Sequence, residues 1–572
     1  MWLCRHSPTA QVPYLHHDQI RAENIACFRA IKWFCASWEA IEVIAMAIPF
    51  VGRPIQSGYH GTIEPPRPLI ETQQYAPAAV PGIALATLAQ SMDGRMISGL
   101  MPTIEGGLAL TPDEGAWLLI AYLCASIIVL PLSPWLSGYF GRRTYFLASI
   151  AGFGISALLC ASATSIGALV LFRVLQGAFG GGLIASSHAA LRTSLPPSHL
   201  GTSQVAFIGS YIGAPLTLGP LISGIITDGN YYWQWMFVVD AAIAALSFAL
   251  CWKSFKDDQE KQRVPGDPIG VALFAGFVIP LQYLFIQGER YNWLDDPNIV
   301  GLIVLCVLCL AGLIWWHTRS QTALFSEGIR AHRSSAVVAL LIGCIGLCLS
   351  GGVAVALAFA ERLLYFTGTL AGSLLVVRAL AFLPLTVLMG VIMDKRSPRA
   401  YPLVVAGLVL FALGFALQCA WATTDTSFAL LVKALIVSGL GIGPAIVPLL
   451  WWLFREVPQS RTLAVTALVD TALVLGTTTA QALVPTALDH RFAFHSLVLS
   501  SNMTLGHLAT ATRLAPSAHT LREFTQFVTQ QSYALAFADV ALVLTAIALI
   551  SLPLVALLRK TDRNGTAAQA DI

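Results

Sequence analysis

Charged side chains are scarce in this sequence of 572 residues. Asp, Glu, Lys and Arg together make up 11% of it, whereas hydrophobic residues make up 56%. A soluble domain usually carries about 25% charged residues. A single hydrophobic core stops growing beyond roughly 250–300 residues, so a chain of this length cannot bury so much apolar surface in water. The scarcity of charge therefore excludes an ordinary soluble protein and indicates one that lies in a lipid bilayer.

Signals for a polyanionic partner or an inorganic cofactor are also missing. Lys and Arg number 33 and Asp and Glu 30, so the net charge is only +3, and no basic stripe with interleaved aromatic residues indicates a nucleic-acid partner. Cys306 and Cys309 lie in an uncharged apolar run, which favours packing over zinc or redox chemistry. The histidines between residues 489 and 533 lack the tight spacing of metal ligands. We therefore expect neither a metal nor an organic cofactor.

Long apolar runs dominate the sequence instead. A helix that crosses the hydrocarbon core needs about 20 mostly apolar residues. Strands are excluded because the runs are too long and lack an alternation of period two. The chain is therefore predicted to be an all-α polytopic membrane protein. Its predicted spans cover approximately 81–104, 114–136, 144–163, 165–188, 201–227, 233–252, 268–288, 297–317, 334–360, 370–393, 401–420, 427–453, 462–488 and 536–558.

Basic residues gather in alternate segments between these spans, and an excess of positive charge marks the cytoplasmic side of a membrane. The basic side includes Arg142, Lys253, Arg319, Lys395 and Arg455. The opposite segments hold only Arg290, Arg362, Arg491, Arg513 and Arg522. The alternation supports an even number of spans, so both termini are predicted to be cytoplasmic.

The chain divides further by composition. Residues 27–51 are apolar but interrupted by Arg29, Lys32, Glu39 and Glu42, so a poorly ordered extension is expected there, with an interfacial helix as the alternative. The predicted units are an N-terminal extension (1–80), a six-helix bundle (81–252), a linker with two extra spans (253–333), a second six-helix bundle (334–560) that includes an external loop (489–533), and a cytoplasmic tail (561–572).

Charges inside the predicted spans are few, and each costs about 2.5–3.5 kcal/mol to insert. Asp93 is the first candidate for proton coupling, because apolar surroundings disfavour the charged form of a carboxyl and let it bind and release a proton. A fixed ion pair is the alternative, although Arg95, two residues away, would point to another helix face. Arg173 has no carboxylate at helical spacing on its own span, so its partner must come from another helix or from backbone carbonyls.

Two further acidic residues within the spans, Asp240 and Asp470, are candidates for substrate binding or coupling. Either could pair with a cationic substrate, or with Lys433 or Arg378, and an interfacial position is the alternative for Asp240. His188 and two other histidines, His199 and His317, are isolated near span ends. With no nucleophile–base pair in sight, they offer little support for an enzyme.

Two copies of one loop pattern stand at equivalent places in the two predicted bundles. The first copy runs from Pro134 to Arg143 and the second from Gly390 to Arg396. They are similar to the cytoplasmic hinge motif Gly-x-Leu-Ala-Asp-Arg-x-Gly-Arg-Arg of the major facilitator superfamily. In the first copy Gly138 replaces the motif's Asp, which puts its usual contact with a helix terminus in doubt. The residues of this motif are Gly138, Gly141, Arg142 and Arg143 in the first copy and Gly390, Asp394, Lys395 and Arg396 in the second.

Other motifs follow in the order that this superfamily shows. The fourth span reads Leu171-Phe-Arg173-Val-Leu-Gln-Gly177, like the family's buried-arginine motif. The first span carries Met92-Asp93-Gly94-Arg95, and Gln287-Gly288-Glu289-Arg290 is typical of a fourteen-span branch. The fifth span resembles the antiporter motif through Gly213, Pro215, Gly219, Pro220 and Gly224.

Over residues 82–560 the chain therefore resembles the fourteen-span drug:proton antiporters of the EmrB/QacA type. The resemblance implies two six-helix bundles with two extra central spans, and alternating access driven by the proton gradient. Asp93 and Arg173 would handle the proton, while the Gly-Pro span would seal the cavity and bend. It also implies export of small amphipathic or toxic compounds from a bacterial inner membrane, and allows for a periplasmic adaptor and an outer-membrane channel as partners.

Other functions stay open at this point. An uptake or metabolite permease on the same fold would have a similar sequence, and only the resemblance of the Gly-Pro span favours export. A multi-pass enzyme is a weaker alternative, because the spans show no cluster of His, Asp or Glu near one membrane face. A channel would need a polar pore-lining ring or filter, which is not evident.

Overall fold

The computed structural model describes residues 76–229, 232–255, 266–291, 293–320, 322–332, 334–366, 368–501 and 518–570. Helices and short turns account for these residues, and no strand occurs in the ranges given. The all-helical prediction is therefore confirmed there. The predicted N-terminal extension lies almost wholly outside the described residues.

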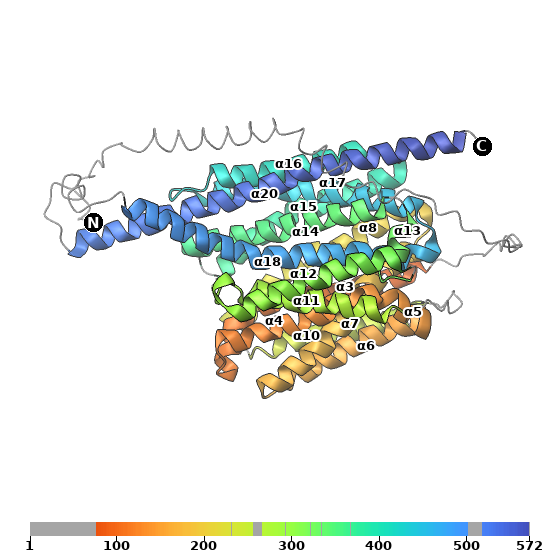
Figure 1. Ribbon diagram of the computed structural model, residues 1–572, viewed down its shortest axis with the longest axis horizontal. Coiled ribbons are helices and arrows are strands. Elements are labelled where there is room, and N and C mark those ends of the chain that lie inside the picture. Colours follow the sequence, from red (N-terminus) through yellow and green to blue (C-terminus); the bar gives the residue numbers. More distant parts are fainter. Residues whose placement is uncertain are drawn as a thin grey trace, which may run out of the picture. The chain divides into compact units, whose positions relative to one another are not determined.

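The first half of the molecule comprises the helices α3 to α10, which run side by side (Figure 1). Some spans are built from consecutive helical pieces: α4 continues through η2 into α5, and α8 continues through the π-helical turn η4 into α9. The helices are α3 (Val80–Leu108), α4 (Pro112–Val129), η2 (Leu130–Leu132), α5 (Ser133–Phe140), α6 (Arg142–Ala161), α7 (Ile166–Ser194), α8 (Leu200–Ile208), η4 (Gly209–Gly213), α9 (Ala214–Asp228) and α10 (Trp235–Ser254).

The second half comprises α14 to α20, and three helices connect it to the first. Of the connecting helices, α12 is little buried, so most of its apolar surface is left for lipid. The connecting helices are α11 (Pro268–Gln287), α12 (Pro297–Arg319) and α13 (Ser326–Ala331). The second half consists of α14 (Ser335–Ala358), η6 (Phe359–Leu363), α15 (Gly368–Arg396), α16 (Ala400–Ala420), α17 (Phe428–Glu456), η7 (Gln459–Arg461), α18 (Thr462–Ser501) and α20 (Ala518–Ala570).

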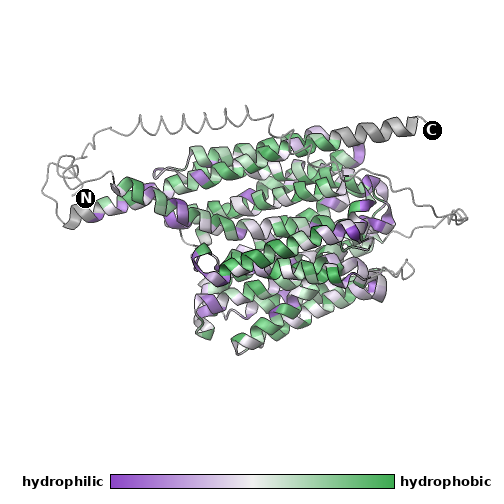
Figure 2. Cartoon of the chain, in the orientation of Figure 1, coloured by the Kyte–Doolittle hydropathy of each residue, from purple (hydrophilic) through white to green (hydrophobic). Residues whose placement is uncertain are grey.

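Hydrophobic residues make up most of the middle of these helices, and hydrophilic residues are more frequent toward their ends (Figure 2). Within the described residues, 13 helical segments are long and apolar enough to cross a membrane. The helix α3 is not among them because Asp93 and Arg95 lower its mean hydropathy, yet it is 29 residues long and packs against α7, α9 and α10. With α3 counted, the structure agrees with the predicted fourteen spans.

The last two spans extend beyond their predicted limits. The helix α18 continues to Ser501 and α20 begins at Ala518, so much of the predicted external loop 489–533 is helical. Polar side chains in the extensions find partners on the neighbouring helix: Arg491 Nε lies 2.6 Å from Asp539 Oδ2, and His495 Nε2 lies 2.7 Å from the same oxygen. These contacts explain why the helices persist past the apolar runs from which their ends were predicted.

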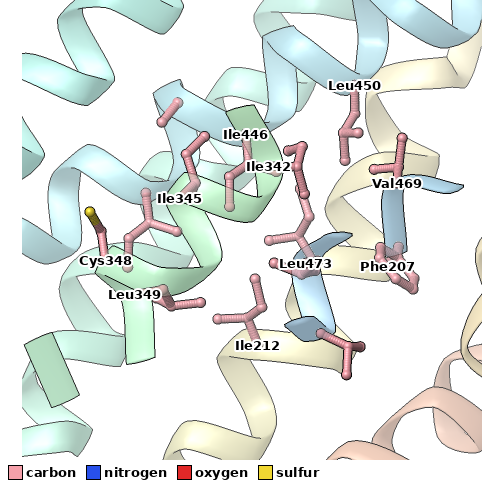
Figure 3. Close-up of a cluster of buried hydrophobic side chains, with 14 of the residues drawn as sticks. Phe207, Ile212, Ile342, Ile345, Cys348, Leu349, Ile446, Leu450, Val469 and Leu473 are labelled. Atoms are coloured by element: carbon pink, nitrogen blue, oxygen red, sulfur yellow. The ribbon is translucent and has the colours of Figure 1, made fainter. Parts of the chain in front are cut away.

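An apolar cluster joins the two halves at the centre of the molecule (Figure 3). Phe207 and Ile212 enter it from the first half, from α8 and η4. They meet buried residues of α14, α17 and α18, which include Ile342, Leu450 and Val469. Since lipid offers no hydrophobic drive for helix association, this contact depends on close van der Waals packing.

Glycines set the distance between α16 and α17 in the second half. A Cβ added at Gly414 would lie 2.5 Å from both the Cβ and the backbone nitrogen of Ser438, so the two backbones approach closely there. Small residues at such contacts let membrane helices pack tightly.

We expect Gly414→Ala to destabilise the protein by about 1–3 kcal/mol, because α16 and α17 must move apart to accept the methyl group. Thermal unfolding in detergent measures the change. Gly301→Ala is the matched control, since Gly301 on α12 has open space around its Cα and should change the unfolding temperature little. Equal effects of the two substitutions would contradict the close approach.

Candidate functional site

Asp93 and Arg173 form an ion pair inside the first half, and both side chains are fully buried. Arg173 Nη1 donates to Asp93 Oδ1 at 2.8 Å and to Oδ2 at 2.9 Å. Gln176, one helical turn along α7, accepts from Arg173 Nη1 at 2.9 Å and donates to Asp93 Oδ1 at 3.2 Å. The predicted proton-coupling residues therefore lie together, and Arg173 takes its partner from another helix.

Aromatic rings complete the surroundings of this guanidinium group. Its central carbon lies 4.2 Å from the ring centroid of Tyr122 and 5.8 Å from that of Phe237. Arg173 Nε donates to the Leu118 carbonyl oxygen at 3.4 Å, whereas Nη2 has no hydrogen-bond partner. A cation held over ring faces in apolar surroundings is stabilised without a second ionised acid.

Asp240 joins this pair from α10. Its side chain is fully buried, and it contacts Asp93 through a carboxyl–carboxyl hydrogen bond and interacts electrostatically with Arg173. In the described residues no N–H or hydroxyl group donates to its carboxyl oxygens. Asp240 therefore belongs to the Asp93–Arg173 cluster inside the first half. Two carboxyl groups thus share one guanidinium, and with both acids ionised the buried cluster would carry a net charge of −1. One proton on either acid makes the cluster neutral.

Arg378 and Arg95 bring positive charge to the contact between the two halves. Arg378, on α15, is fully buried; its Nη1 donates to the Leu349 carbonyl oxygen at 3.4 Å, and its Nε and Nη2 atoms have no hydrogen-bond partner. Arg95, on α3, packs against Gly219 of α9 and is close enough to Arg378 for the two cations to repel each other. In the described part of the chain, neither arginine has a carboxylate in salt-bridge contact. Lys433 is exposed and is not brought to Asp240 or Asp470.

The antiporter motif shapes the contact between the halves along η4 and α9. Pro215 has no N–H and would clash with the carbonyl of Tyr211 in a regular α-helix, and the π-helical turn Gly209–Gly213 lies at this point. A Cβ at Gly213 would lie 2.5 Å from Leu383 Cδ2 of α15, and one at Gly219 would lie 2.6 Å from Arg95 Cβ. These glycines therefore allow close packing, and Pro220 faces Gly372 of α15.

The second hinge motif closes one contact between the halves. Asp394, at the end of α15, accepts from the backbone N–H of Gly201 at 2.6 Å and of Thr202 at 2.9 Å, and from the Thr202 hydroxyl at 2.7 Å. Its carboxylate thus satisfies the free N–H groups at the start of α8. Gly390 lies against Gly201, whereas Lys395 and Arg396 are exposed.

The first hinge motif leaves an opening at the corresponding place. Gly138 offers no carboxylate to η7 and the start of α18, and a cavity of about 510 Å³ separates them. We name this cavity the vestibule. Gly138, Gly141 and Arg142 line it from one side and Arg461 and Thr462 from the other. Arg143 turns away and donates to the carbonyl oxygens of Phe255 and Trp252, at 2.8 and 2.6 Å.

A second buried ion pair was missed by sequence reasoning. Asp470 does not meet Lys433 or Arg378; its partner is His188, whose Nδ1 lies 2.9 Å from Asp470 Oδ1. The two residues are 282 positions apart and sit on α7 and α18, in different halves. No local pattern in the sequence links them, since the isolated histidine resembled a residue at a span end.

The sequence is similar to that of known transport proteins. A sequence profile of the Major Facilitator Superfamily matches residues 83–365. The chain is 27% identical to the multidrug export protein EmrB of Haemophilus influenzae over 368 residues, which cover 64% of this chain and 71% of that protein. It is 26% identical to the fatty acid resistance protein FarB of Neisseria gonorrhoeae, with 78% and 86% of the two chains covered.

Solved structures share the fold at low sequence identity. The crystal structure of the human organic anion transporter MFSD10 (TETRAN) matches with a TM-score of 0.54 and 14% identity, covering 84% of this chain and 99% of that one. The proton:xylose symporter XylE matches with a TM-score of 0.50 and 15% identity, covering 82% and 94%. At this low identity, the two structural similarities show that the helices are arranged alike, and they show the fold alone.

The geometry predicts strong coupling between Asp93 and Arg173 in stability measurements. Arg173→Gln leaves two buried carboxyls without their cation and should cost about 3–5 kcal/mol. The double variant, Arg173→Gln with Asp93→Asn, should lose less stability than the sum of the losses of the two single variants. We expect the difference to be at least about 1 kcal/mol, as measured by thermal unfolding in detergent.

Arg378→Gln serves as the control for this cycle, because Arg378 does not contact Asp93. Its effect should add to that of Asp93→Asn. Additive effects for Asp93 and Arg173 as well would show that the two side chains do not depend on each other.

Proposed function

Since the chain belongs to the major facilitator superfamily, within its drug:proton antiporters, we propose that it is a proton-driven exporter of small amphipathic or toxic compounds. The observation that carries the proton coupling is the charge balance of the buried cluster: Asp93 and Asp240 share the single guanidinium of Arg173. The names of the relatives, which include multidrug export and multidrug resistance proteins, support export as the direction.

Alternating access turns this charge balance into a transport cycle. While the cluster is closed off from water, one carboxyl holds a proton, because a net negative charge in apolar surroundings is unfavourable. When the halves rock and water reaches the cluster, the ionised form is solvated and the proton leaves. Arg173 keeps the carboxylate of Asp93 in place, and Asp240, which has no direct ion pair with Arg173, is the group that takes and gives up the proton.

The proton gradient sets the direction of the cycle if the vestibule faces the cytoplasm. The excess of basic residues at that end supports this orientation, with both termini in the cytoplasm and the protein in a bacterial inner membrane. A thiol placed in the vestibule should then react with a membrane-impermeant reagent from the cytoplasmic side and not from the other.

A periplasmic adaptor and an outer-membrane channel are fitting partners for an EmrB-like exporter, and co-purification of such an adaptor with the chain would test this.

Arg95 and Arg378 indicate where a substrate makes polar contact. These two cations repel each other between the halves and, among the described residues, have no carboxylate in salt-bridge contact, so an acidic group on the substrate would supply the missing counter-charge. Apolar residues of both halves, among them Leu216 and Leu375, pack together nearby and suit the hydrophobic part of such a compound. One relative is named for resistance to fatty acids, which have this chemistry.

The coupling role is tested with purified protein in vesicles under an imposed pH gradient. Asp93→Asn and Asp240→Asn should each lower gradient-driven transport at least about tenfold while substrate still binds, because the cluster can no longer exchange its proton. An uncoupler should abolish transport by the wild type. Export by both variants at the wild-type rate and with the wild-type pH dependence would place the coupled proton elsewhere.

The substrate contact is tested in the same vesicles with a fatty acid and a lipophilic cationic dye. Arg378→Gln should lower transport of the fatty acid at least about tenfold and change transport of the dye less than about twofold. Lys253→Gln, which removes an exposed cation from the end of α10, is the control and should affect neither. Equal losses for both compounds would assign Arg378 a structural role.

A further inference from the structure

His188 and Asp470 form a buried ion pair that bridges the two halves and that the coupling cluster does not use. His188 Nδ1 lies 2.9 and 3.1 Å from the two carboxyl oxygens of Asp470, and the side chains are 0% and 1% exposed. The imidazole stacks on Phe207 of α8, with the ring centroids 3.7 Å apart, and meets Phe454 of α17 edge-on at 5.2 Å. A titratable pair is thus enclosed by aromatic rings from both halves.

The hydrogen bonds around His188 fix how many protons the pair holds. His188 Nε2 lies 3.0 Å from Gln204 Oε1, and the other amide atom, Nε2 of Gln204, donates to the Ser203 hydroxyl oxygen at 3.3 Å. That hydroxyl gives its own hydrogen to the Leu200 carbonyl at 2.7 Å, so it can only accept from Gln204. The Gln204 amide therefore presents its oxygen to His188, and His188 Nε2 must carry a hydrogen.

The second nitrogen faces an acceptor too. A hydrogen must lie between His188 Nδ1 and the Asp470 carboxyl, either on the ring or on the acid. In both descriptions the pair carries no net charge and holds one proton more than a neutral histidine beside an ionised aspartate. If that proton is removed, one of the two short contacts becomes acceptor against acceptor and the buried pair acquires a net charge of −1.

We propose that His188 and Asp470 are a proton-binding site that ties the two halves together beside the vestibule, and that this site releases a proton when the halves separate there. We name the pair the inter-half latch. It is distinct from the Asp93 cluster, because His188 lies fifteen positions beyond Arg173 on α7, which is about 22 Å at 1.5 Å per residue.

The position of the latch suits this role. Ala189 and Ala467 line the vestibule. Ala189 directly follows His188 on α7, and Ala467 lies one turn before Asp470 on α18. The vestibule therefore ends against the latch, and opening there gives the pair direct access to water. On this side Gly138 replaces the hinge carboxylate, so no contact like that of Asp394 holds α18, and the latch supplies the missing attachment.

Non-titrating contacts surround the latch and serve as comparisons. The Thr466 hydroxyl donates to the Ala185 carbonyl oxygen at 3.2 Å, which joins α18 to α7 one turn from the latch. Arg192, one turn further along α7, donates to the Phe454 carbonyl oxygen at 3.2 Å. Of the other groups facing the pair, Tyr211 of η4 interacts with Asp470 and Gln204 of α8 bonds His188. Thr466 and Arg192 therefore join the two halves by contacts that do not involve the proton between His188 and Asp470.

Opening the latch transfers one proton to water. The bond broken is the contact between His188 Nδ1 and Asp470, and water then solvates the separated groups. At cytoplasmic pH an imidazolium in water gives its proton to a water molecule, which leaves a neutral histidine and an ionised aspartate. Closing reverses the step and needs a proton from the same side, so a lower pH in the vestibule favours the closed arrangement.

Cysteine labelling measures this directly and requires no transported substrate. In Ala467→Cys the new thiol is buried beside the latch, and its reaction with a membrane-impermeant maleimide reports opening of the vestibule. Labelling is measured in vesicles. The rate with unfolded protein corrects for the pH dependence of the thiol reaction itself, and the rate with the parent chain corrects for its own cysteines. The corrected labelling rate should rise at least about threefold between about pH 6 and about pH 8. With His188→Gln and Asp470→Asn added, labelling should be fast and independent of pH.

Two controls separate the latch from other effects. Thr466→Val removes a neighbouring inter-half hydrogen bond without a proton, so it should raise labelling at every pH and leave the midpoint unchanged. Asp93→Asn should retain the pH dependence of labelling, even though it disables coupled transport, which separates failure of the latch from failure of the coupling cluster. Labelling of Ala467→Cys that does not change with pH would overturn the inference. Labelling with the same pH dependence after His188→Gln and Asp470→Asn are added would also overturn it. The first of these outcomes does not depend on whether the variant with both added substitutions folds.

Discussion

The absence of water in the hydrocarbon core is the constraint on which the rest of this structure depends. Every backbone polar group must be satisfied within its own segment, so the described chain is helical, and each charge inside it must be matched or used. Asp93 and Arg173 pair with each other, Gln176 hydrogen-bonds to both of them, and Tyr122 covers the cation. The second carboxyl group of the cluster, that of Asp240, has no cation of its own, and chemistry with a proton becomes possible there.

The two halves repeat one plan but close by different means. In the second half Asp394 caps the start of α8 through a carboxylate held by three donors. In the first half Gly138 cannot do the same for α18, and the vestibule, a cavity of about 510 Å³, takes its place. On this side the ion pair of His188 and Asp470 joins the two halves instead, and in the mechanism proposed above its formation requires a proton. A single substitution in a repeated motif thus coincides with a change in the kind of contact that holds that side.

Sequence reasoning reached the fold and part of the site for identifiable reasons. Hydropathy located most spans because length and apolarity alone decide insertion, and it misjudged the ends of α18 and α20 because Arg491 and His495 find Asp539 only in three dimensions. The rule that a buried charge needs a partner led to Asp93 and Arg173. The same rule could not choose a partner for Asp470, since helix phase and tilt decide which side chains face each other. His188 was overlooked for this reason, and so was the proximity of Asp240 to Asp93.

The helix α7 carries one member of each buried ion pair, Arg173 and His188, at two depths in the membrane. Their separation of about 22 Å is roughly three quarters of a hydrocarbon core of about 30 Å. A positive charge that passes between these depths therefore crosses a similar share of the membrane's electric field. Each 100 mV of membrane potential contributes about 2.3 kcal/mol for a full crossing, and so about 1.7 kcal/mol for this one. Because the latch exchanges its proton with the vestibule side alone, only a proton that passes from the Asp93 cluster to the vestibule end of α7 makes this crossing, and such a step would use the electrical part of the proton gradient as well as its pH part.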